Sequence, residues 1–171
     1  MTVARELSSH VPTAIQRRRR LRLARTLVGG SVRRALLPPG SARGRERVQV
    51  CRAANMLSAL GVRVEVVGGA VPWPRSERVV VSDHTGWLGD LALSTAVPRT
   101  PVISRARALP AGAVVCPVVV RYRTAAGYLG RDDVPQTPAE VAAVRDLVVE
   151  VHRLPALEPV PGASSLVTAA A

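Results

Sequence analysis

The stretch Val79-Val80-Val81-Ser82-Asp83-His84-Thr85-Gly86-Trp87-Leu88-Gly89-Asp90 joins a run of β-branched residues to the start of a helical pattern. β-Branched residues favour strands, and the apolar residues of 88–96 recur at helical spacing. His84 is therefore expected at a turn between a strand and a helix, with Asp90 close behind it. A histidine with a nearby carboxylate is typical of general base catalysis, because the carboxylate can fix the tautomer of the imidazole. The same residue types also form a helix cap beside a structural histidine.

Strand and helix patterns alternate on both sides of this stretch, which predicts an α/β fold. A chain of 171 residues suits one domain, so we expect a single mixed sheet with flanking helices, preceded by a basic N-terminal helix. In the last strand, alternation puts Glu150 and His152 on one face. Sites in α/β folds lie where strands end and helices begin, and His84 has such a position. The other expected elements are helices at 45–60 and 138–144, and strands at 62–67, 77–82, 101–104, 114–122, 126–130 and 147–154.

The net charge of +12 comes from the N-terminal third of the chain, and every basic residue is arginine. Residues 1–63 hold 14 arginines against two glutamates, whereas the remainder is neutral. Over 15–37, apolar residues at helical spacing alternate with arginines, among them Arg17, Arg18, Arg19 and Arg20. One interpretation is an amphipathic helix on an anionic membrane surface, and the other is a solvated basic face packed on the domain. Nucleic acid is not the expected partner, because no reading module or aromatic stacking platform accompanies the charge.

Several classes of protein are disfavoured by the composition. Cys51 and Cys116 are far apart and form no Cys/His cluster, which argues against a zinc site and against a disulfide framework. No uninterrupted apolar run is long enough to span a membrane, and the N-terminus lacks the apolar core of a signal peptide. We expect a cytoplasmic protein, peripheral on the inner face of the membrane. The expected division is a basic amphipathic segment over 1–43, an α/β domain over 44–155 and a disordered tail over 156–171.

Residues 81–90 resemble the first motif of the glycerolipid acyltransferases, the lysophosphatidate (1-acylglycerol-3-phosphate) acyltransferase family. That motif reads Ser-Asn-His-x-Ser-Trp-Leu-Asp. Residues 115–133 and 148–152 are similar to the C-terminal part of bacterial members, including their Val-Pro-Val strand, and residues 60–66 are similar to the family's lead into its first strand. Three matches in the family's order are more specific than any one alone. The resemblance covers roughly residues 20 to 155 and implies a reduced version of the family's fold.

The resemblance implies an enzyme of phospholipid biosynthesis that moves a fatty acyl group to the free hydroxyl of a lysophospholipid. The acyl donor is a thioester of coenzyme A or of acyl carrier protein, and no metal or other cofactor is needed. His84 takes the part of the general base and Asp90 that of its orienting acid. The candidates for substrate binding are the motif neighbours Thr85, Gly86 and Trp87, together with Arg105 and Arg107, which alternatively lie in a solvated loop.

This chain departs from the family's pattern at two places. Five residues instead of four separate His84 from Asp90, and Gly89 stands where the family has its aspartate. The family's Gly-x-x-Phe-Ile-x-Arg and Pro-Glu-Gly-Thr segments, which bind the acceptor's phosphate, are missing after Arg105, as in an internal deletion. Three hypotheses follow: a reduced but active acyltransferase, an inactive relic that only binds membrane lipid, and a basic nucleic-acid-binding protein.

Overall fold

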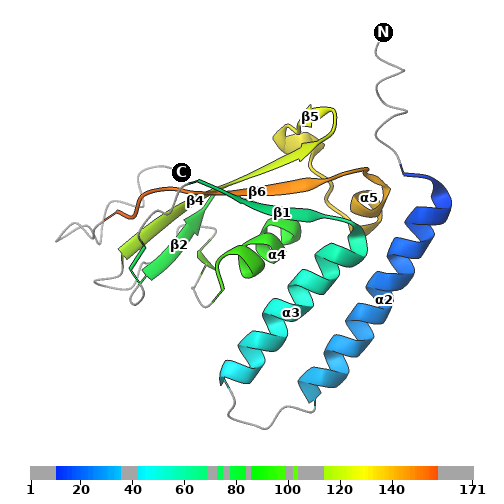
Figure 1. Cartoon of the computed structure of the whole chain (residues 1–171), viewed down its shortest axis with the longest axis horizontal. Coiled ribbons are helices and arrows are strands. Elements are labelled where there is room, and N and C mark those ends of the chain that lie inside the picture. Colours follow the sequence, from blue (N-terminus) through cyan, green and yellow to red (C-terminus); the bar gives the residue numbers. More distant parts are fainter. Residues whose placement is uncertain are drawn as a thin grey trace.

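The computed structural model describes residues 11–35, 42–68, 73–74, 78–83, 86–98, 102–103 and 114–157. Its helices are α2 (Thr13–Ala35), α3 (Ala42–Leu60), α4 (Trp87–Ala96), the 3-10 helix η1 (Arg131–Asp133) and α5 (Pro138–Ala143). Its strands are β1 (Arg63–Val67), β2 (Arg78–Ser82), β3 (Val102–Ile103), β4 (Val114–Thr124), β5 (Gly127–Tyr128) and β6 (Val148–Arg153) (Figure 1).

The strands form one open, mixed sheet in the order β1-β6-β4-β2-β3, with β5 paired to the end of β4. β1 runs parallel to β6, and β2 runs parallel to both β3 and β4. β4 and β6 are antiparallel, as are β4 and β5. The prediction of an α/β fold with a mixed sheet and flanking helices is therefore confirmed.

The central strand β4 contains Pro117, which has no N–H group to give to a neighbouring strand. On the side of β6, Val118 pairs with Arg153, and the next pair is Val115 with Leu157. Two residues of β4 thus face three of the returning chain, which is the count of a β-bulge. Pro117 lies within this bulge and still accepts a hydrogen bond at its carbonyl. The chain therefore tolerates proline in a central strand because the ladder is already interrupted there.

The core lies between α4 and one face of the sheet. In β4 the even-numbered residues are buried on this side, and in β6 the odd-numbered ones, which is the period of two expected for strands. Val80, Leu93 and Val149 are fully buried here. Each such side chain contributes about 1.5–3 kcal/mol on burial, so an almost purely aliphatic core can hold this sheet and α4 together. Because the chain contains no phenylalanine, many van der Waals contacts between small aliphatic side chains replace the few large contacts that aromatic rings would make.

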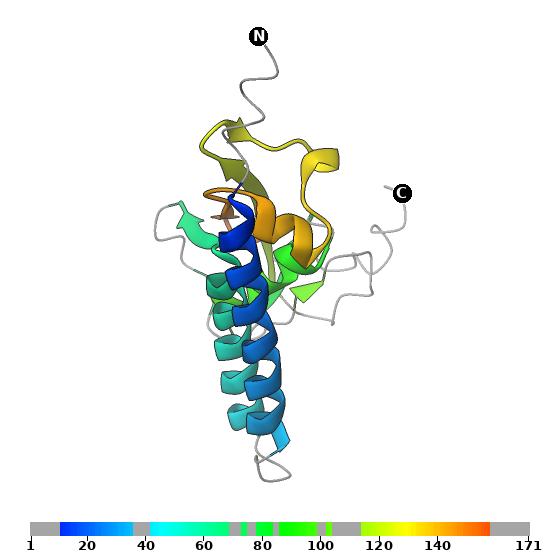
Figure 2. The ribbon, with the colours of Figure 1, turned by 90° about the vertical axis from the view of Figure 1, so that its right-hand side faces the viewer.

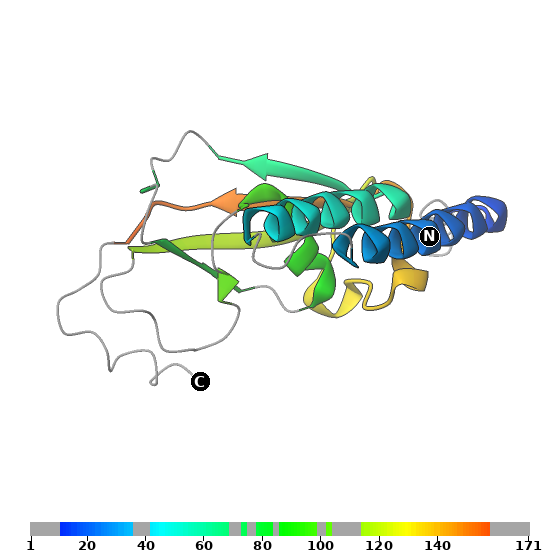
Figure 3. The ribbon, with the colours of Figure 1, turned by 90° about the horizontal axis from the view of Figure 1, so that it is seen from below.

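The helices α2 and α3 lie side by side and project beyond the sheet (Figures 1 and 2). Seen from below, both lie in front of the strands, on the side of α4 (Figure 3). α3 ends at Gly61, where φ is 76° and where Val62 N–H bonds the carbonyl of Leu57. This is a Schellman termination, which glycine favours because it lacks a Cβ atom. The predicted end of this helix at residue 60 is thus confirmed.

α2 is joined to the domain through the C-terminal end of α5. Arg19 Nη1 donates hydrogen bonds to the carbonyls of Ala142 (3.2 Å) and Val144 (2.9 Å), and Val11 N–H donates to that of Ala143 (2.8 Å). These bonds satisfy carbonyl groups that a helix end would otherwise leave without partners. The structure therefore includes α2 in the fold, and the expected segment boundary after residue 43 lies just inside α3, which begins at Ala42.

The chain stays in regular contact with the sheet up to the last described residue. Leu157 exchanges two backbone hydrogen bonds with Val115, of 2.7 and 3.1 Å. The first two residues of the expected tail, 156–157, thus continue beside the beginning of β4. Residues 158–171 lie outside the described residues.

Candidate functional site

Four of the residues singled out from the sequence lie outside the described residues. These are His84 and Thr85, in the turn after β2, and Arg105 and Arg107, after β3. The described residues on either side of the turn nevertheless show which part of the fold it joins. Asp83 directly follows β2, and Gly86 directly precedes α4. A strand therefore precedes this segment and a helix follows it, as the sequence predicts.

The described residues of the motif lie against the segment before α5. Gly86 has φ of 120° and a Cβ at this position would come within 3.6 Å of Oε1 of Gln136. Trp87 Nε1 donates a hydrogen bond of 2.7 Å to the backbone carbonyl of Gln136. Asp90 lies in the first turn of α4, where a carboxylate is favoured by the helix dipole, and it is exposed. The motif is thus held at a fixed place beside β4 by Gln136.

A cavity of about 480 Å³ opens where β2 stops. β2 pairs with β4 only as far as Ser82 and Val118, and β5 begins to pair at Arg123. Between these points no strand of the described residues pairs with this edge of β4, and Leu129 N–H bonds the Tyr122 carbonyl there at 2.8 Å. Asp83 partly closes the gap, because its Oδ1 lies 3.5 Å from the backbone N of Val120, the long limit of a hydrogen bond. The cavity is lined by Asp83, Val120, Arg121, Tyr122, Tyr128, Leu129, Arg131, Val134 and Gln136.

The Tyr122 hydroxyl is the buried polar group of this cavity. The residue is 8% exposed, and within the described residues its oxygen has no hydrogen-bond partner. The pKa of Tyr122 is raised to about 12, mainly by burial and to a lesser extent by the carboxylates of Asp90 and Asp83. Tyr122 therefore keeps its proton at neutral pH and can act as a hydrogen-bond donor there, not as a base.

Two arginines reach the cavity from different elements. Arg121 lies on β4, and its guanidinium carbon is 6.0 Å from the centre of the Tyr128 ring. Arg131 begins η1. Both are exposed, and in the described parts of the chain neither forms an ion pair within 4.0 Å. The cavity thus combines exposed positive charge with a buried neutral hydroxyl.

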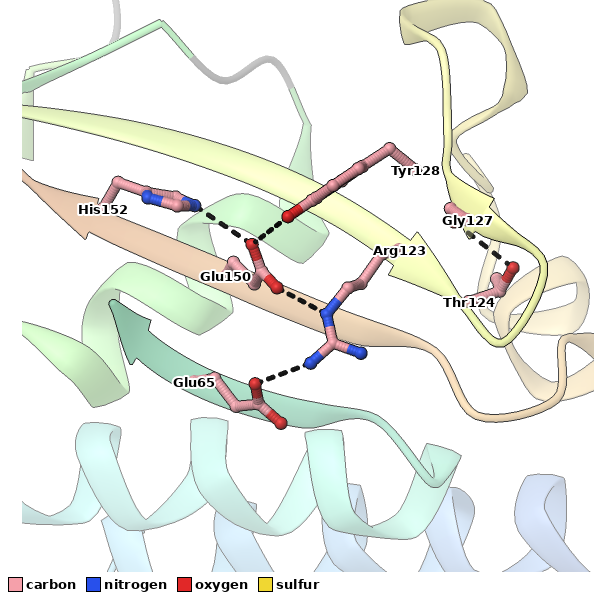
Figure 4. Close-up of polar contacts among 7 residues, drawn as sticks. All are labelled: Glu65, Arg123, Thr124, Gly127, Tyr128, Glu150 and His152. Atoms are coloured by element: carbon pink, nitrogen blue, oxygen red, sulfur yellow. Dashed lines mark hydrogen bonds and ion pairs between the residues drawn. The ribbon is translucent and has the colours of Figure 1, made fainter. Parts of the chain in front are cut away.

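A separate polar cluster, the Glu150 cluster, lies on the face of the sheet opposite α4 and consists of Glu65, Arg123, Tyr128, Glu150 and His152 (Figure 4). The Glu150 carboxylate accepts hydrogen bonds from Arg123 Nε and, at 3.0 Å, from the Tyr128 hydroxyl, and its Oε2 lies 3.1 Å from His152 Nε2. Arg123 Nη2 donates to Glu65 at 2.7 Å. The Arg123 hydrogen bond is the main cause of the lowered pKa of Glu150. Glu150 is therefore a buried charged residue whose hydrogen-bond partners are themselves partly exposed.

Tyr128 connects the two sites. Its ring lines the cavity and faces Arg121, while its hydroxyl is held by Glu150. The position of this ring is thus determined by the Glu150 cluster. The predicted placement of Glu150 and His152 on one face of the last strand is confirmed.

The sequence analysis missed the residues that line the cavity from β4 and from the segment after it. Arg121 and Tyr122 are adjacent polar residues inside a strongly apolar strand. Their presence is the only sequence signal of a polar group there. Arg131 and Gln136 lie in a connection between β5 and α5 and have no spacing that relates them to β2. They line the same cavity as Asp83 only because β4 and β2 are adjacent in the sheet.

Comparisons with protein-family models, with curated proteins and with solved structures find no match to this chain. In the ranges that the structure describes, no three histidine, cysteine, aspartate or glutamate side chains are grouped so that they could hold a metal ion. In the same ranges, no helix is both long enough and apolar enough to cross a bilayer.

Proposed function

We propose that this protein transfers a fatty acyl group from an acyl thioester to the free hydroxyl of a lysophospholipid, with His84 as the general base. The observation that carries the proposal is the cavity at the end of β2. Asp83 lines it, and Gly86 and Trp87 contact Gln136, another of its lining residues. The described residues that precede and follow His84 and Thr85 therefore lie beside a cavity large enough for part of a lipid headgroup, since ligand sites usually start at about 300 Å³.

In the proposed reaction His84 removes the proton of the acceptor hydroxyl while the oxygen attacks the thioester carbonyl. The carbon–sulfur bond then breaks, and the sulfur leaves as a thiol with the proton that His84 had taken. Asp90 stabilises the positively charged imidazole through a carboxylate in the first turn of α4. The Tyr122 hydroxyl, which keeps its proton because its pKa is about 12, is a candidate donor to the developing oxyanion.

The experiment mixes the full-length protein with acyl-CoA and lysophosphatidate and follows the release of free thiol. We expect turnover by the wild type and a loss of about 100-fold or more in His84→Ala, because a general base contributes at least that much. His152→Ala is the matched control: it removes a histidine from the opposite face of the sheet and should retain the rate. Absence of turnover in the wild type, or an active His84→Ala, would reject the proposal.

Asp90→Asn tests the orienting role separately. It should lower kcat with little change in KM, because it acts on the imidazolium of the transition state. Asp146→Asn, at an exposed carboxylate between α5 and β6, is the control with the same chemical change. An unchanged kcat in Asp90→Asn would remove Asp90 from the mechanism and leave His84 to be judged by its own variant.

The basic helix α2 supports a second part of the proposal, which is docking on an anionic membrane surface. Leu21, Val28 and Val32 are exposed and fall on one stripe of the helix, since they are spaced by seven and four residues. Arg17, Arg18 and Arg20 are exposed on the same helix. Near an anionic leaflet each arginine contributes about 1 kcal/mol, so apolar and charged contacts would act together. Arg19, by contrast, is held by the carbonyls at the end of α5.

Flotation with vesicles tests this docking without removing α2 from the fold. We compare anionic phosphatidylglycerol vesicles with neutral phosphatidylcholine vesicles, and the triple variant Arg17→Glu, Arg18→Glu, Arg20→Glu with the wild type. A control triple variant, Arg45→Glu, Arg47→Glu, Arg63→Glu, reverses the charge of three arginines that are exposed on α3 and β1. Only the α2 variant should lose flotation on anionic vesicles. Equal flotation of both variants would reject α2 as the docking surface, and flotation without thiol release would identify a lipid-binding relic. Salt-sensitive binding to DNA without flotation would favour a nucleic-acid partner.

A further inference from the structure

The arginines of this protein differ in whether the fold uses their charge. Arg123 is held between Glu65 and Glu150, and Arg19 is held by backbone carbonyls. Arg121 and Arg131 line the cavity and, within the described residues, have no carboxylate partner. The guanidinium groups of these two therefore remain available to an anion that enters the cavity.

The arrangement of Arg121 depends on the gap in the sheet. Arg121 pairs with Glu150 of β6 in the strand register, so its side chain starts on the face opposite α4. It can also line the cavity because β2 ends before this level of β4, which leaves the edge of the sheet open. The Tyr128 ring, held by its hydroxyl on Glu150, lies beside the guanidinium. A ring in this position limits where the guanidinium can go and keeps it near the cavity.

The charges that line the cavity favour an anion. Two guanidinium groups face one carboxylate, that of Asp83, whose Oδ1 lies near the Val120 N–H. The amide nitrogen of Gln136 is engaged with the Val134 carbonyl at 2.8 Å. Guanidinium groups present parallel N–H donors at the spacing of phosphate oxygens, which makes two arginines in one cavity a suitable phosphate site.

We propose that this cavity binds a phosphate monoester through Arg121 and Arg131. The identity of the ligand rests on the proposed function: the monoester is the headgroup of the lysophosphatidate acceptor. From the sequence, Arg105 and Arg107, which follow β3, are candidates for substrate binding, with a solvated loop as the alternative. In this proposal the phosphate is bound instead by residues of β4 and η1, which line the cavity together with Asp83.

The binding experiment uses a soluble probe and needs no turnover. sn-Glycerol 3-phosphate is titrated into the full-length protein at low ionic strength by calorimetry, with glycerol and inorganic phosphate as separate arms. We expect saturable binding of glycerol 3-phosphate, weaker binding of phosphate and none of glycerol. Arg121→Gln and Arg131→Gln should each weaken binding about tenfold or more, because each removes charge-assisted hydrogen bonds.

Arg145→Gln is the matched control, since Arg145 is exposed and lies outside the cavity beside Asp146. It should bind like the wild type. Unfolding curves of all three variants confirm that they are folded. Equal affinity of the wild type and both cavity variants would overturn the proposal, as would equal binding of glycerol. Phosphate bound as tightly as glycerol 3-phosphate would show a site for the free ion and overturn the assignment to a headgroup.

The two proposals fail in different ways. Binding that depends on Arg121 and Arg131, in a protein that never releases thiol, leaves the phosphate site standing and rejects the acyl transfer. Thiol release that depends on His84, with no binding lost in the arginine variants, supports the acyl transfer and rejects this site. If both hold, the arginine variants raise KM for lysophosphatidate and leave kcat nearly unchanged, as expected for groups that bind the ground state and the transition state alike.

Discussion

The Glu150 cluster and the cavity at the end of β2 are built from the same kinds of side chain, but only the cluster is internally satisfied. In the cluster, Glu150 is surrounded by donors, and the charge of Arg123 is shared by two carboxylates. In the cavity, the described residues give the Tyr122 hydroxyl no partner and give Arg121 no carboxylate. The two regions are adjacent, because Tyr128 belongs to the cluster and also lines the cavity. They therefore differ in their hydrogen-bond partners and not in their location in the fold.

This difference separates a structural use of polar groups from a binding use. A buried polar group without a hydrogen bond costs stability, whereas one with its partners in place contributes modestly. The cluster therefore stabilises the junction of β1, β6 and β4. The cavity lowers the free energy of unfolding and leaves hydrogen-bond donors available to a ligand. Such a loss of stability is common at functional sites. The three predictions that follow test this contrast.

The largest effect is expected from Glu150→Ala. It removes the shared acceptor of Arg123, Tyr128 and His152, and a hydrogen bond to a charged group contributes about 1.5–3 kcal/mol. Glu65→Ala removes the half-exposed partner of the same arginine and should cost no more than about 1 kcal/mol. Urea unfolding followed by circular dichroism measures both. Equal losses in the two variants would show that the cluster does not depend on the buried carboxylate.

A smaller effect is expected from acid. The pKa of Glu150 is lowered in the folded protein, mainly by the Arg123 hydrogen bond, so its contribution is complete above the ordinary value of 4.5 and is lost as pH falls through the lower folded value. The urea concentration at the unfolding midpoint of the wild type should decrease when the pH is lowered below 4.5. In Glu150→Gln the midpoint should be lower at pH 7 and should fall less steeply with acid.

Glu140 gives the control for this acid dependence. Its pKa is also lowered, mainly by the backbone N–H of Gln136, with a further hydrogen bond from Thr137. The decrease of the unfolding midpoint with acid should therefore be less steep in the double variant Glu140→Gln, Glu150→Gln than in either single variant. An acid slope that is the same in the wild type and Glu150→Gln would contradict the role given to Glu150.

The smallest effect is expected from Tyr122→Phe, and its sign is opposite. Because the hydroxyl is buried without a partner in the described structure, its removal should leave the free energy of unfolding unchanged or raise it by up to about 1 kcal/mol. Tyr128→Phe is the matched control, since it removes a hydroxyl that donates to Glu150, and it should lower stability. A loss of stability in Tyr122→Phe would show that its hydroxyl has a partner and would weaken the contrast between the two regions.

Local patterns predicted most of the elements correctly. The stop of α3 at Gly61, the strand after it and the alternation of Glu150 with its valine neighbours follow from backbone preferences and side-chain periodicity, which act over a few residues. The short strands and the edges of helices were less accurate. α3, for example, begins at Ala42, three residues before the expected helix, because helix ends depend on contacts as well as on propensity.

The interpretation of α2 shows where such patterns stop being informative. Four consecutive arginines, Arg17 to Arg20, look alike in the sequence, but Arg19 faces α5 and lies against Gly61, where a Cβ would come within 2.5 Å of its guanidinium. On a helix, successive residues point about 100° apart, so one of the four can be structural while its neighbours stay exposed. Which one faces the domain is decided by how α2 packs on α3 and α5.

The sequence by itself determined the type and order of the elements and the position of the His84 turn between a strand and a helix, because hydrophobic periodicity and turn residues act locally. Only the tertiary structure decided the sheet order, and with it that Arg121, Tyr122 and Arg131 line the same cavity as Asp83, which directly follows β2. The physical reason is that β2 and β4 meet through long-range backbone hydrogen bonds, and the cavity exists because their pairing ends at Ser82 while β4 continues.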